Sequence, residues 1–508
     1  MRVFVFGIGG TGARVITQLV MHLATGARPV DSNGKVLKDG FSIVPILIDP
    51  HAECDALVTL GELLNDYRKI NKRLYGDGDP GKGFFSVKIQ TLYDVDKNIG
   101  HDDFAFRLQN ISNKSFKDFI GKEFMTAESD KFMEFLFSKE ELNTEMSEGF
   151  YGSPNIGCVA LNSFCESPDF IAFKNSLQSQ VDKVFFIGSI FGGTGASGLP
   201  LFITNIRSLL KGDAMDSNNS GKTPIGALVV MPYFSIGEDS ESPINDSDFM
   251  IKTRSALSYY ESNLNRSIND VYYIADWGPK KRTNPFENDP GNKENQKGNK
   301  AHIVEFMGAT AIFDYIKSDN KDVNDDGTVA KTNFKAYGID SDDESIGTIT
   351  FKEFGDGVKD LRLPYMKFLI MKHYMENYLA SETGKPYASD HEPKIDASII
   401  SNTELQRIFK KVDSLMSEMG SHGTAAHNLS ICNEILGKSY TNMFKNITLK
   451  EKKFFGGNVD RTSICKRLNR VADDTKKEFK DIATGEQRWF AIADIAIENV
   501  IRDSCDLK

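Results

Sequence analysis

This sequence contains few cysteines and few tryptophans, and it has no long apolar run. Six cysteines and two tryptophans are spread over 508 residues, and no two cysteines have the C-x-x-C spacing. Disulfide scaffolds and zinc fingers depend on such patterns, so the sequence is typical of a reducing compartment. No run of 18 apolar residues is present, and Met1-Arg2 leads straight into a short apolar segment, unlike a signal peptide. We therefore expect a cytoplasmic protein without membrane segments.

A strong excess of one charge is also missing. The chain has 61 lysines and arginines against 71 aspartates and glutamates, and the two signs are mixed along it. Direct binding to nucleic acid or to an anionic membrane calls for a concentrated basic surface, so neither is expected. With 40% hydrophobic residues, a chain of this length can bury more than one average domain core. Nucleotides and proteins are the expected partners.

Two glycine-rich loops are the most informative feature that is present. Each follows an apolar, strand-like run and opens an apparent helix: Gly7–Gly12 follows Val3–Phe6, and Phe191–Gly198 follows Val184–Ile187. Glycine lets the backbone approach a ligand closely, and the first N–H groups of the following helix bind an anion. Two such loops in one domain predict two contacts with one polyphosphate.

Strand and helix patterns alternate up to about residue 316. The runs Ser42–Ile48, Lys183–Ile190 and Ile225–Val230 have the continuous hydrophobicity of strands that are buried on both faces. We predict an α/β fold with a Rossmann-like parallel sheet, in which ligands bind at the carboxyl ends of the strands. A further strand is predicted over Val271–Ala275. The predicted helices are Arg14–Leu23, Cys54–Leu74, Lys131–Leu142, Asp169–Gln180, Leu199–Leu210, Phe249–Leu264 and Ala301–Ile316.

The pattern becomes mainly helical from Pro364 onward. We predict an α/β domain over residues 1–363, with insertions near 76–155 and 279–300, and a helical C-terminal module over 364–508. Residues 317–360 are acidic and irregular. The predicted helices of the module are Tyr365–Leu379, Thr403–Met419, Ala425–Phe444, Arg461–Ile482 and Trp489–Ile501.

Taken alone, the first loop fits the dinucleotide-binding pattern G-x-G-x-x-G. Asp49 is then a candidate for the acid that binds the ribose, although it lies further along the chain than the usual spacing of about 20 residues. On this interpretation the protein is a Rossmann oxidoreductase that uses NAD or FAD. The second loop has no role in such an enzyme.

The second loop resembles the phosphate loop of the tubulin and FtsZ superfamily. Gly192-Gly193-Thr194-Gly195 is similar to the GGGTGTG signature, and Gly7–Gly12 is similar to the family's amino-terminal phosphate loop. The segment Val229–Ser235 resembles the FtsZ strand that ends in Pro-Phe-Ser. Over residues 1–316 the order of elements agrees, and the start of the last predicted helix looks closer to a less-studied prokaryotic tubulin-like group.

The resemblance implies a tubulin/FtsZ-type fold that binds GTP or GDP with Mg²⁺. It also implies that copies of the chain associate head to tail into filaments, with GTP hydrolysis left open. Phe191 and Ser197 depart from the family pattern, because each replaces a smaller residue of the second loop.

Carried over position by position, the resemblance implies a set of binding residues. Asp49 would contact Mg²⁺ indirectly; the alternative is that Asp49-Pro50 is a strand-ending turn. The residues that would meet the phosphates are Gly9, Gly10, Thr11 and Gly12 of the first loop and Gly192, Gly193, Thr194, Gly195 and Ala196 of the second.

The base would be bound further along the chain. Asp276 stands where FtsZ has an asparagine, which leaves guanine and adenine both open. His302 would stack on the base or Glu305 would bind its edge, near Asn299. The alternative is a surface helix start that Asn299 caps.

The acids that this family uses for hydrolysis have no clear counterpart. In the family they come from a loop after the central helix and enter the neighbouring subunit's site. The candidates here belong to one acidic stretch, where most carboxylates are simply solvated: Asp340, Asp342, Asp343, Asp356 and Asp360. A second hypothesis is therefore a nucleotide-stabilised scaffold without hydrolysis, whose helical module recruits a protein partner.

Overall fold

The computed structural model describes most of the first 340 residues and shorter parts of the remainder. The described residues are 1–38, 40–50, 54–108, 111, 114–146, 150, 153–178, 181–212, 222–236, 246–275, 287–288, 301–319, 323–324, 327–337, 348–349, 357–358, 361–382, 399, 401–420, 428–429, 450–451, 461–475 and 485–504. They belong to two compact units, which are described separately. The first unit comprises Met1–Gln18, Phe41–Glu62 and Ile89–Asp340, and the second comprises Leu19–Gly40, Leu63–Lys88 and Ser341–Lys508.

These units divide the chain differently from the predicted domains. The second unit includes residues 19–40 and 63–88, which the sequence analysis assigned to the α/β domain. The boundary at residue 363 and the two insertions stay predictions.

A parallel sheet forms the centre of the first unit. Its seven strands have the order β3-β2-β1-β4-β5-β7-β9, and the pairs with a defined register are parallel. This confirms the predicted α/β class with a parallel sheet. The strands are β1 (Arg2–Ile8), β2 (Ser42–Ile48), β3 (Lys88–Ile89), β4 (Lys183–Ser189), β5 (Ile225–Val230), β7 (Asp270–Ile274) and β9 (Asn333–Ala336). Two short strands, β6 (Ser235–Ile236) and β8 (Glu287–Asn288), pair apart from the sheet.

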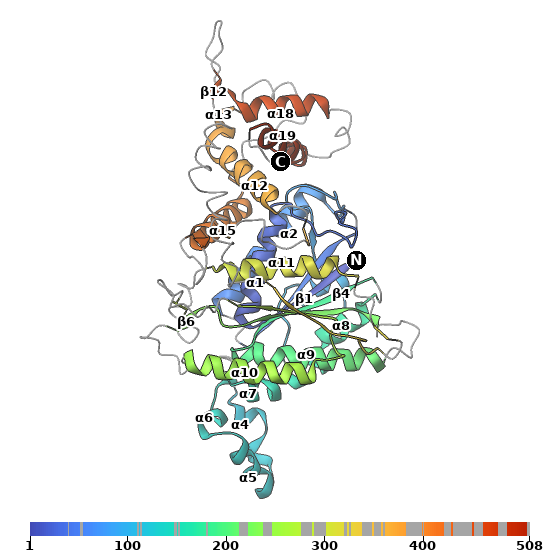
Figure 1. Cartoon of the computed structure of the whole chain (residues 1–508), viewed down its shortest axis with the longest axis vertical. Coiled ribbons are helices and arrows are strands. Elements are labelled where there is room, and N and C mark those ends of the chain that lie inside the picture. Colours follow the sequence, from blue (N-terminus) through green and yellow to red (C-terminus); the bar gives the residue numbers. More distant parts are fainter. Residues whose placement is uncertain are drawn as a thin grey trace. The chain divides into compact units, whose positions relative to one another are not determined.

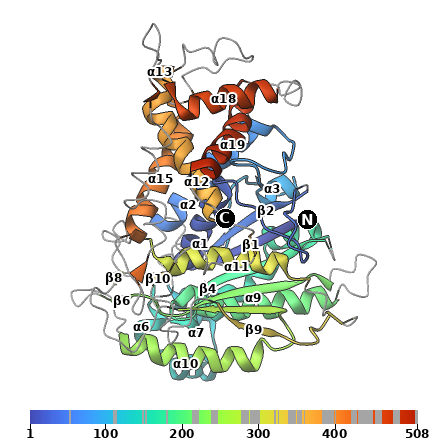
Figure 2. The same cartoon turned by 45° about the horizontal axis from the view of Figure 1, so that its top comes forward.

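Helices cover both faces of the sheet. α1 and α11 lie on one face, and α8, α9 and α10 lie on the other (Figure 1). Figure 2 shows the same layers from a second direction. The helices of this part of the chain are α1 (Gly9–Ala24), α2 (Asp55–Tyr75), α3 (Leu92–Val95), α4 (Phe116–Phe119), α5 (Ala127–Leu136), α6 (Lys139–Leu142), α7 (Pro154–Leu161), α8 (Pro168–Ser176), α9 (Gly193–Gly212), α10 (Asp246–Asn263) and α11 (Ile303–Lys317).

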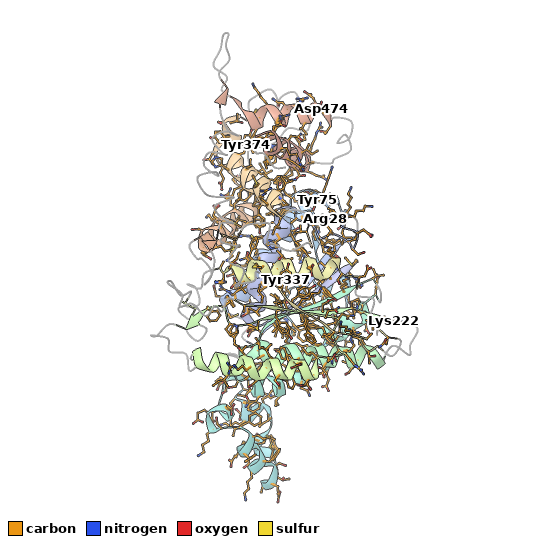
Figure 3. The ribbon with its side chains drawn as sticks, viewed as in Figure 1. Arg28, Tyr75, Lys222, Tyr337, Tyr374 and Asp474 are labelled. Carbon is orange, nitrogen blue, oxygen red and sulfur yellow. The ribbon has the colours of Figure 1, made fainter. Side chains whose placement is uncertain are left out.

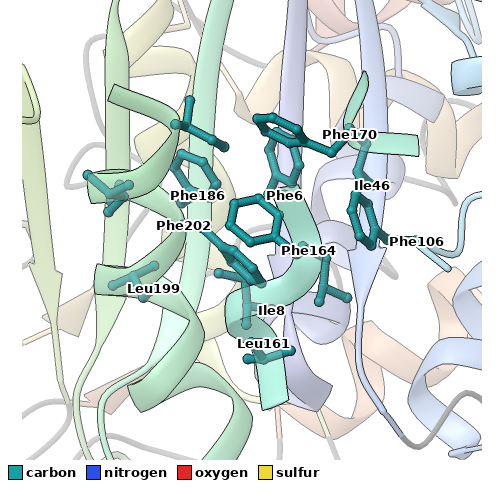
Figure 4. Close-up of a cluster of buried hydrophobic side chains, with 14 of the residues drawn as sticks. Phe6, Ile8, Ile46, Phe106, Leu161, Phe164, Phe170, Phe186, Leu199 and Phe202 are labelled. Carbon is teal, nitrogen blue, oxygen red and sulfur yellow. The ribbon is translucent and has the colours of Figure 1, made fainter. Parts of the chain in front are cut away.

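Aromatic side chains fill the space between the sheet and the α8, α9 layer (Figure 4). Phe6 of β1 stacks on Phe186 of β4 with ring centroids 4.8 Å apart. Phe164 meets Phe202 of α9 at 4.2 Å, and Phe173 of α8 packs edge-on against Phe6. Such pairs add to the stabilisation from the buried area itself.

On the other face, α11 is buried on nearly all sides. Thirteen of its fifteen residues are buried, which agrees with a helix that is mostly apolar on all sides. Thr310 lies 2.9 Å, hydroxyl to hydroxyl, from Tyr337, which Figure 3 labels beside this helix. This helix confirms the prediction over Ala301–Ile316 apart from its first two residues.

Three sequence expectations are corrected here. Residues 317–360 include the edge strand β9, whose alternating exposure and short length gave no apolar run. The helix predicted from Leu199 begins at Gly193, because the glycines that resemble a loop already form its first turn. Within the helix predicted over Ala425–Phe444, the described pair β11 (Asn428–Leu429) is extended and pairs with β10 (Thr348–Ile349).

The second unit is mainly helical where it is described. Phe368 of α12 packs against Phe84 and Phe85, and Lys367 forms an ion pair with Asp494 of α19 at 2.6 Å. Arg28, which Figure 3 shows near Tyr75, is buried and paired with Asp79. Its elements are α12 (Arg362–Tyr374), a π-helical turn (Met375–Leu379), α13 (Ala380–Glu382), α15 (Thr403–Gly420), β12 (Lys450–Glu451), β13 (Arg461–Thr462), α18 (Ser463–Asp474) and α19 (Gly485–Ser504).

Candidate functional site

Three neighbouring strands end at the same height. In the register of the sheet, Ile8 of β1 lies opposite Ile48 of β2 and Gly188 of β4. The chain therefore leaves these strands at one level, into Gly9, Asp49 and the second glycine loop. β1 and β4 are also the strands between which the chain order reverses direction across the sheet. In open parallel sheets this switch point is where ligands bind.

The two glycine loops touch each other and Asp49. A Cβ atom placed on Gly9 would lie 3.5 Å from Thr194 Cβ, 3.7 Å from Gly195 N and 3.8 Å from Asp49 Oδ2. Gly9 has φ +73°, a conformation that favours glycine. The structure thus brings Gly9 next to Asp49, Thr194 and Gly195, which are predicted to share one site and come from three separate segments.

Other loop glycines are fixed by close backbone packing. A Cβ atom on Gly12 would lie 2.6 Å from the carbonyl carbon of Gly7, and one on Gly195 would lie 2.5 Å from the oxygen of Ser189. These distances leave no room for a side chain. The glycines therefore allow each helix to start directly against its own strand.

Gly10 differs from these glycines. A Cβ atom on Gly10 would meet nothing within 4 Å, although Gly10 lies in the first turn of α1. No acidic side chain lies in the first turn of α1 or of α9. Each first turn has N–H groups without helical partners and carries the positive end of a helix dipole. The open space at Gly10 is therefore suited to an anion.

The two departures from the family pattern face the protein interior. Ser197 is fully buried and its hydroxyl donates to Gly193 O at 2.7 Å. A Cβ atom on Gly157 of α7 would lie only 2.2 Å from Ser197 Oγ, so the glycine on α7 makes room for the serine. Phe191 is buried against Phe234, with ring centroids 5.5 Å apart. Neither residue reduces the open space at Gly10.

Pro200 lies inside α9 and removes one helical hydrogen bond. Without an N–H group it cannot donate to the carbonyl of Ala196. The hydroxyl of Tyr260 from α10 donates to that oxygen instead, at 3.4 Å. The first two turns of α9 are thus supported from the neighbouring helix.

Asp49 is half-buried at the edge of this space. It lies near Cys54 at the start of α2, where burial and the Asp49 carboxylate together raise the pKa of the thiol to about 12. Among the described residues, no group of three or more histidines, cysteines and acids is arranged to hold a metal ion.

A buried polar network connects α1 with the start of α11. Glu305 accepts from Arg14 Nε at 2.5 Å and from the Tyr233 hydroxyl at 2.8 Å. Burial lowers the pKa of Arg14, but the opposing effect of Glu305 and Tyr233 is larger, so the pKa lies above its usual value. Arg14 was not among the predicted site residues. A single cation in the otherwise apolar first half of α1 was the only signal for it.

His302 is the N-cap of α11. Its Nδ1 accepts from Val304 N at 3.1 Å, while Glu305 accepts from the N–H of His302 at 3.2 Å. The ring is buried and lies 5.1 Å from that of Tyr233. The expectation of a surface helix start capped by Asn299 is therefore wrong, because His302 itself caps a buried helix. Contact between His302 and a base stays a prediction.

Seven of the predicted site residues lie outside the described part of the chain. They are the base and cap candidates Asp276 and Asn299 and the hydrolytic candidates Asp340, Asp342, Asp343, Asp356 and Asp360.

Neither of two comparisons with known proteins finds a relative. No protein-family model matches the chain, and a search of the curated proteins finds no match. Among the described helices, none combines the length and the apolar character that crossing a membrane requires.

Proposed function

We propose that this chain binds a nucleoside triphosphate, GTP with Mg²⁺, at the carboxyl ends of β1 and β4, and that copies associate head to tail through this site. The observation that carries the proposal is the contact between the two glycine loops at the switch point of the sheet. The identity of the nucleotide and the mode of association follow from the resemblance to tubulin and FtsZ. The proposal covers GTP binding and association, and it does not specify whether the chain hydrolyses GTP.

The chemistry of the site fits a polyphosphate. The first turns of α1 and α9 have no acidic side chains, their glycine loops lie next to each other at Gly9 and Thr194, and each supplies backbone N–H donors. In the proposed complex Gly10 and Thr11 hold the first phosphates and Gly193 and Thr194 hold the terminal one. Mg²⁺ prefers oxygen ligands and retains water, so Asp49 would face it through water.

The two-loop arrangement favours a triphosphate over a dinucleotide. A Rossmann oxidoreductase uses one glycine loop, and its acid binds a ribose away from the pyrophosphate. Here Asp49 Oδ2 lies 3.8 Å from the Cβ position of Gly9, which is also 3.5 Å from Thr194 Cβ of the second loop. That position suits a cation on phosphates better than a ribose hydroxyl.

Replacing Gly10 by aspartate tests the proposal without disturbing the fold. The new side chain enters open space, and an acid in the first turn of a helix is compatible with its dipole. Its carboxylate would repel the phosphates and reduce GTP affinity about a hundred-fold. The measurement is titration of the purified protein with GTP and Mg²⁺ by calorimetry.

Gly100→Asp is the matched control. Gly100 is an exposed glycine of the same unit, and its Cβ position also meets nothing within 4 Å. This variant should bind GTP like the wild type, and both variants should melt at the wild-type temperature. Equal GTP affinity in Gly10→Asp and Gly100→Asp would refute the site.

Head-to-tail association has its own test. A heterologous contact that does not close produces filaments. Light scattering and negative-stain imaging of the wild type should show assembly that requires GTP, and Gly10→Asp should not assemble. Tight GTP binding without assembly would refute the proposed head-to-tail association, and the proposed binding site would still stand.

A further inference from the structure

An acidic, aromatic arm extends from the first unit. It consists of residues 114–146, which include α4, α5 and α6, and it lies on the far side of α7 from the sheet (Figure 1). Its base is anchored by buried apolar side chains: Phe116 packs against Phe137 with centroids 4.8 Å apart. Lys122 also forms ion pairs with Asp130 and Glu134. The arm is therefore a folded part of the unit.

The outward side of α5 is apolar and exposed. None of the residues of α5 is buried, and this includes its large apolar side chains. Phe132 is 56% and Phe135 is 85% exposed, and Leu136 is also exposed. These three residues have the spacing i, i+3, i+4 of one helix face, and Glu128 lies one turn before them on that face. A stripe of this kind is normally buried against another surface, and it is the form in which a helix docks into a groove.

The arm is also rich in negative charge. Residues 122–145 contain seven carboxylates and three lysines. An anionic membrane is therefore a poor partner. A protein surface with an unpaired basic side chain is a good one. Glu128 is exposed, and within the described part of the chain it takes part in no ion pair.

The same unit presents a complementary surface on α10. Its outer face carries two exposed apolar side chains, Ile251 at 64% and Tyr259 at 53%. Arg254 lies between them, exposed and without an ion pair among the described residues. Three exposed serines lie on the same face, Ser255, Ser258 and Ser262, and exposed Glu261 flanks it two turns after Arg254. Small residues between apolar ends form a shallow strip into which the rings of another helix fit.

We propose that α5 of one copy docks on the outer face of α10 of a second copy, with Glu128 facing Arg254. Both surfaces remain exposed within one copy, so the α5 stripe does not cover the α10 face of its own chain. A two-fold dimer buries each surface once per chain, and such isologous pairing closes. This association does not use the nucleotide site and goes beyond the proposed head-to-tail contact.

Sedimentation velocity of the full chain tests the dimer, in EDTA and without added nucleotide. The wild type should sediment as a dimer at increasing concentration, and so should Gly10→Asp. The double variant Phe132→Ser, Phe135→Ser should raise the dissociation constant about a hundred-fold, because aromatic anchors dominate such interfaces. Both phenylalanines are exposed, so circular dichroism should show unchanged folding.

A charge exchange tests the pairing of α5 with α10. Glu128→Arg and Arg254→Glu should each weaken the dimer about ten-fold, and the combined variant should restore it. A monomeric wild type would overturn the inference without affecting the nucleotide proposal. A dimer that is insensitive to the serine substitutions, or one that the combined variant does not restore, would overturn it as well.

Discussion

The two ends of the parallel sheet are built in different ways. At the carboxyl ends of β1 and β4 the chain offers glycine backbone and helix N-termini, with an open space at Gly10. At the amino ends the space is filled by charged side chains. Lys183 begins β4 and donates to the carbonyls of Tyr315 at 3.1 Å and Ile316 at 2.9 Å, while Asp270, which begins β7, pairs with Lys335 at 3.1 Å.

This difference shows which end is suited to a ligand. Buried charges that pair with each other close a surface, because an unpaired partner would be costly. Backbone donors without helical partners keep a surface open to an anion. α11 connects the two ends: Glu305 and His302 cap its start, and Lys183 caps its last turn.

The largest effect on stability should come from Glu305→Ala at the carboxyl end. This change leaves Arg14 and Tyr233 without their shared acceptor in a buried place. Removing one partner of a buried ion pair costs about 3–5 kcal/mol. Urea denaturation followed by circular dichroism measures the loss. A loss as small as that of a surface substitution would show that this network does not support the α1–α11 contact.

A smaller effect should come from Gly157→Ala, which tests how the second loop accommodates its serine. The new methyl group would collide with Ser197, and overpacking of this kind costs about 1–3 kcal/mol. Combining it with Ser197→Gly should recover part of the loss, since both contacting serine atoms are then gone and only Phe150 Cδ2, 2.9 Å from the Cβ position, stays close. Equal stability of the single and double variants, measured by thermal melting, would contradict the contact.

At the amino end the test is the pH dependence that Lys183 causes. Burial lowers the pKa of Lys183 to about 8 from 10.5, against the opposing effects of Asp270 and Asp319. At a pH between these two pKa values the unfolded chain binds more protons than the folded chain, so the stability of the fold rises with pH. Relative to Lys183→Met, the wild type should gain about 1–2 kcal/mol from pH 8 to pH 9.5. A difference that stays constant over this range would contradict the assignment.

The smallest effect should come from Tyr260→Phe. It removes the hydroxyl that donates to the Ala196 carbonyl opposite Pro200. A single hydrogen bond of this kind contributes about 0.5–1.5 kcal/mol. The change should lower the melting temperature slightly and leave GTP affinity as it is. A loss beyond that range would mean that Tyr260 contributes more than this bond.

The central strands and the glycine loops were predictable from local pattern. β2 and β5 have the predicted bounds, because strands buried on both faces form continuous apolar runs between polar turns. The edge strand β9 was missed, since half of its residues are exposed and its four residues give no apolar run. Both glycine loops were found because glycine spacing is a local property.

The parts of the site that depend on distant contacts were not predictable. Arg14 and Glu305 are 291 residues apart, and no local pattern pairs them. The role of Gly157 in making room for Ser197 depends on the packing of α7 against α9. His302 was expected near the site but not as the cap of a buried helix, because the burial of α11 follows from the sheet that it covers.

The nucleotide that co-purifies with the wild-type protein tests the central claim most directly. Denaturing the purified protein and separating the released small molecules by chromatography identifies that ligand without any assumption about its role. The glycine-lined end of the sheet predicts GTP or GDP in stoichiometric amount, and its loss from Gly10→Asp but not from Gly100→Asp. Release of NAD or FAD, or equal nucleotide content in both variants, would contradict it.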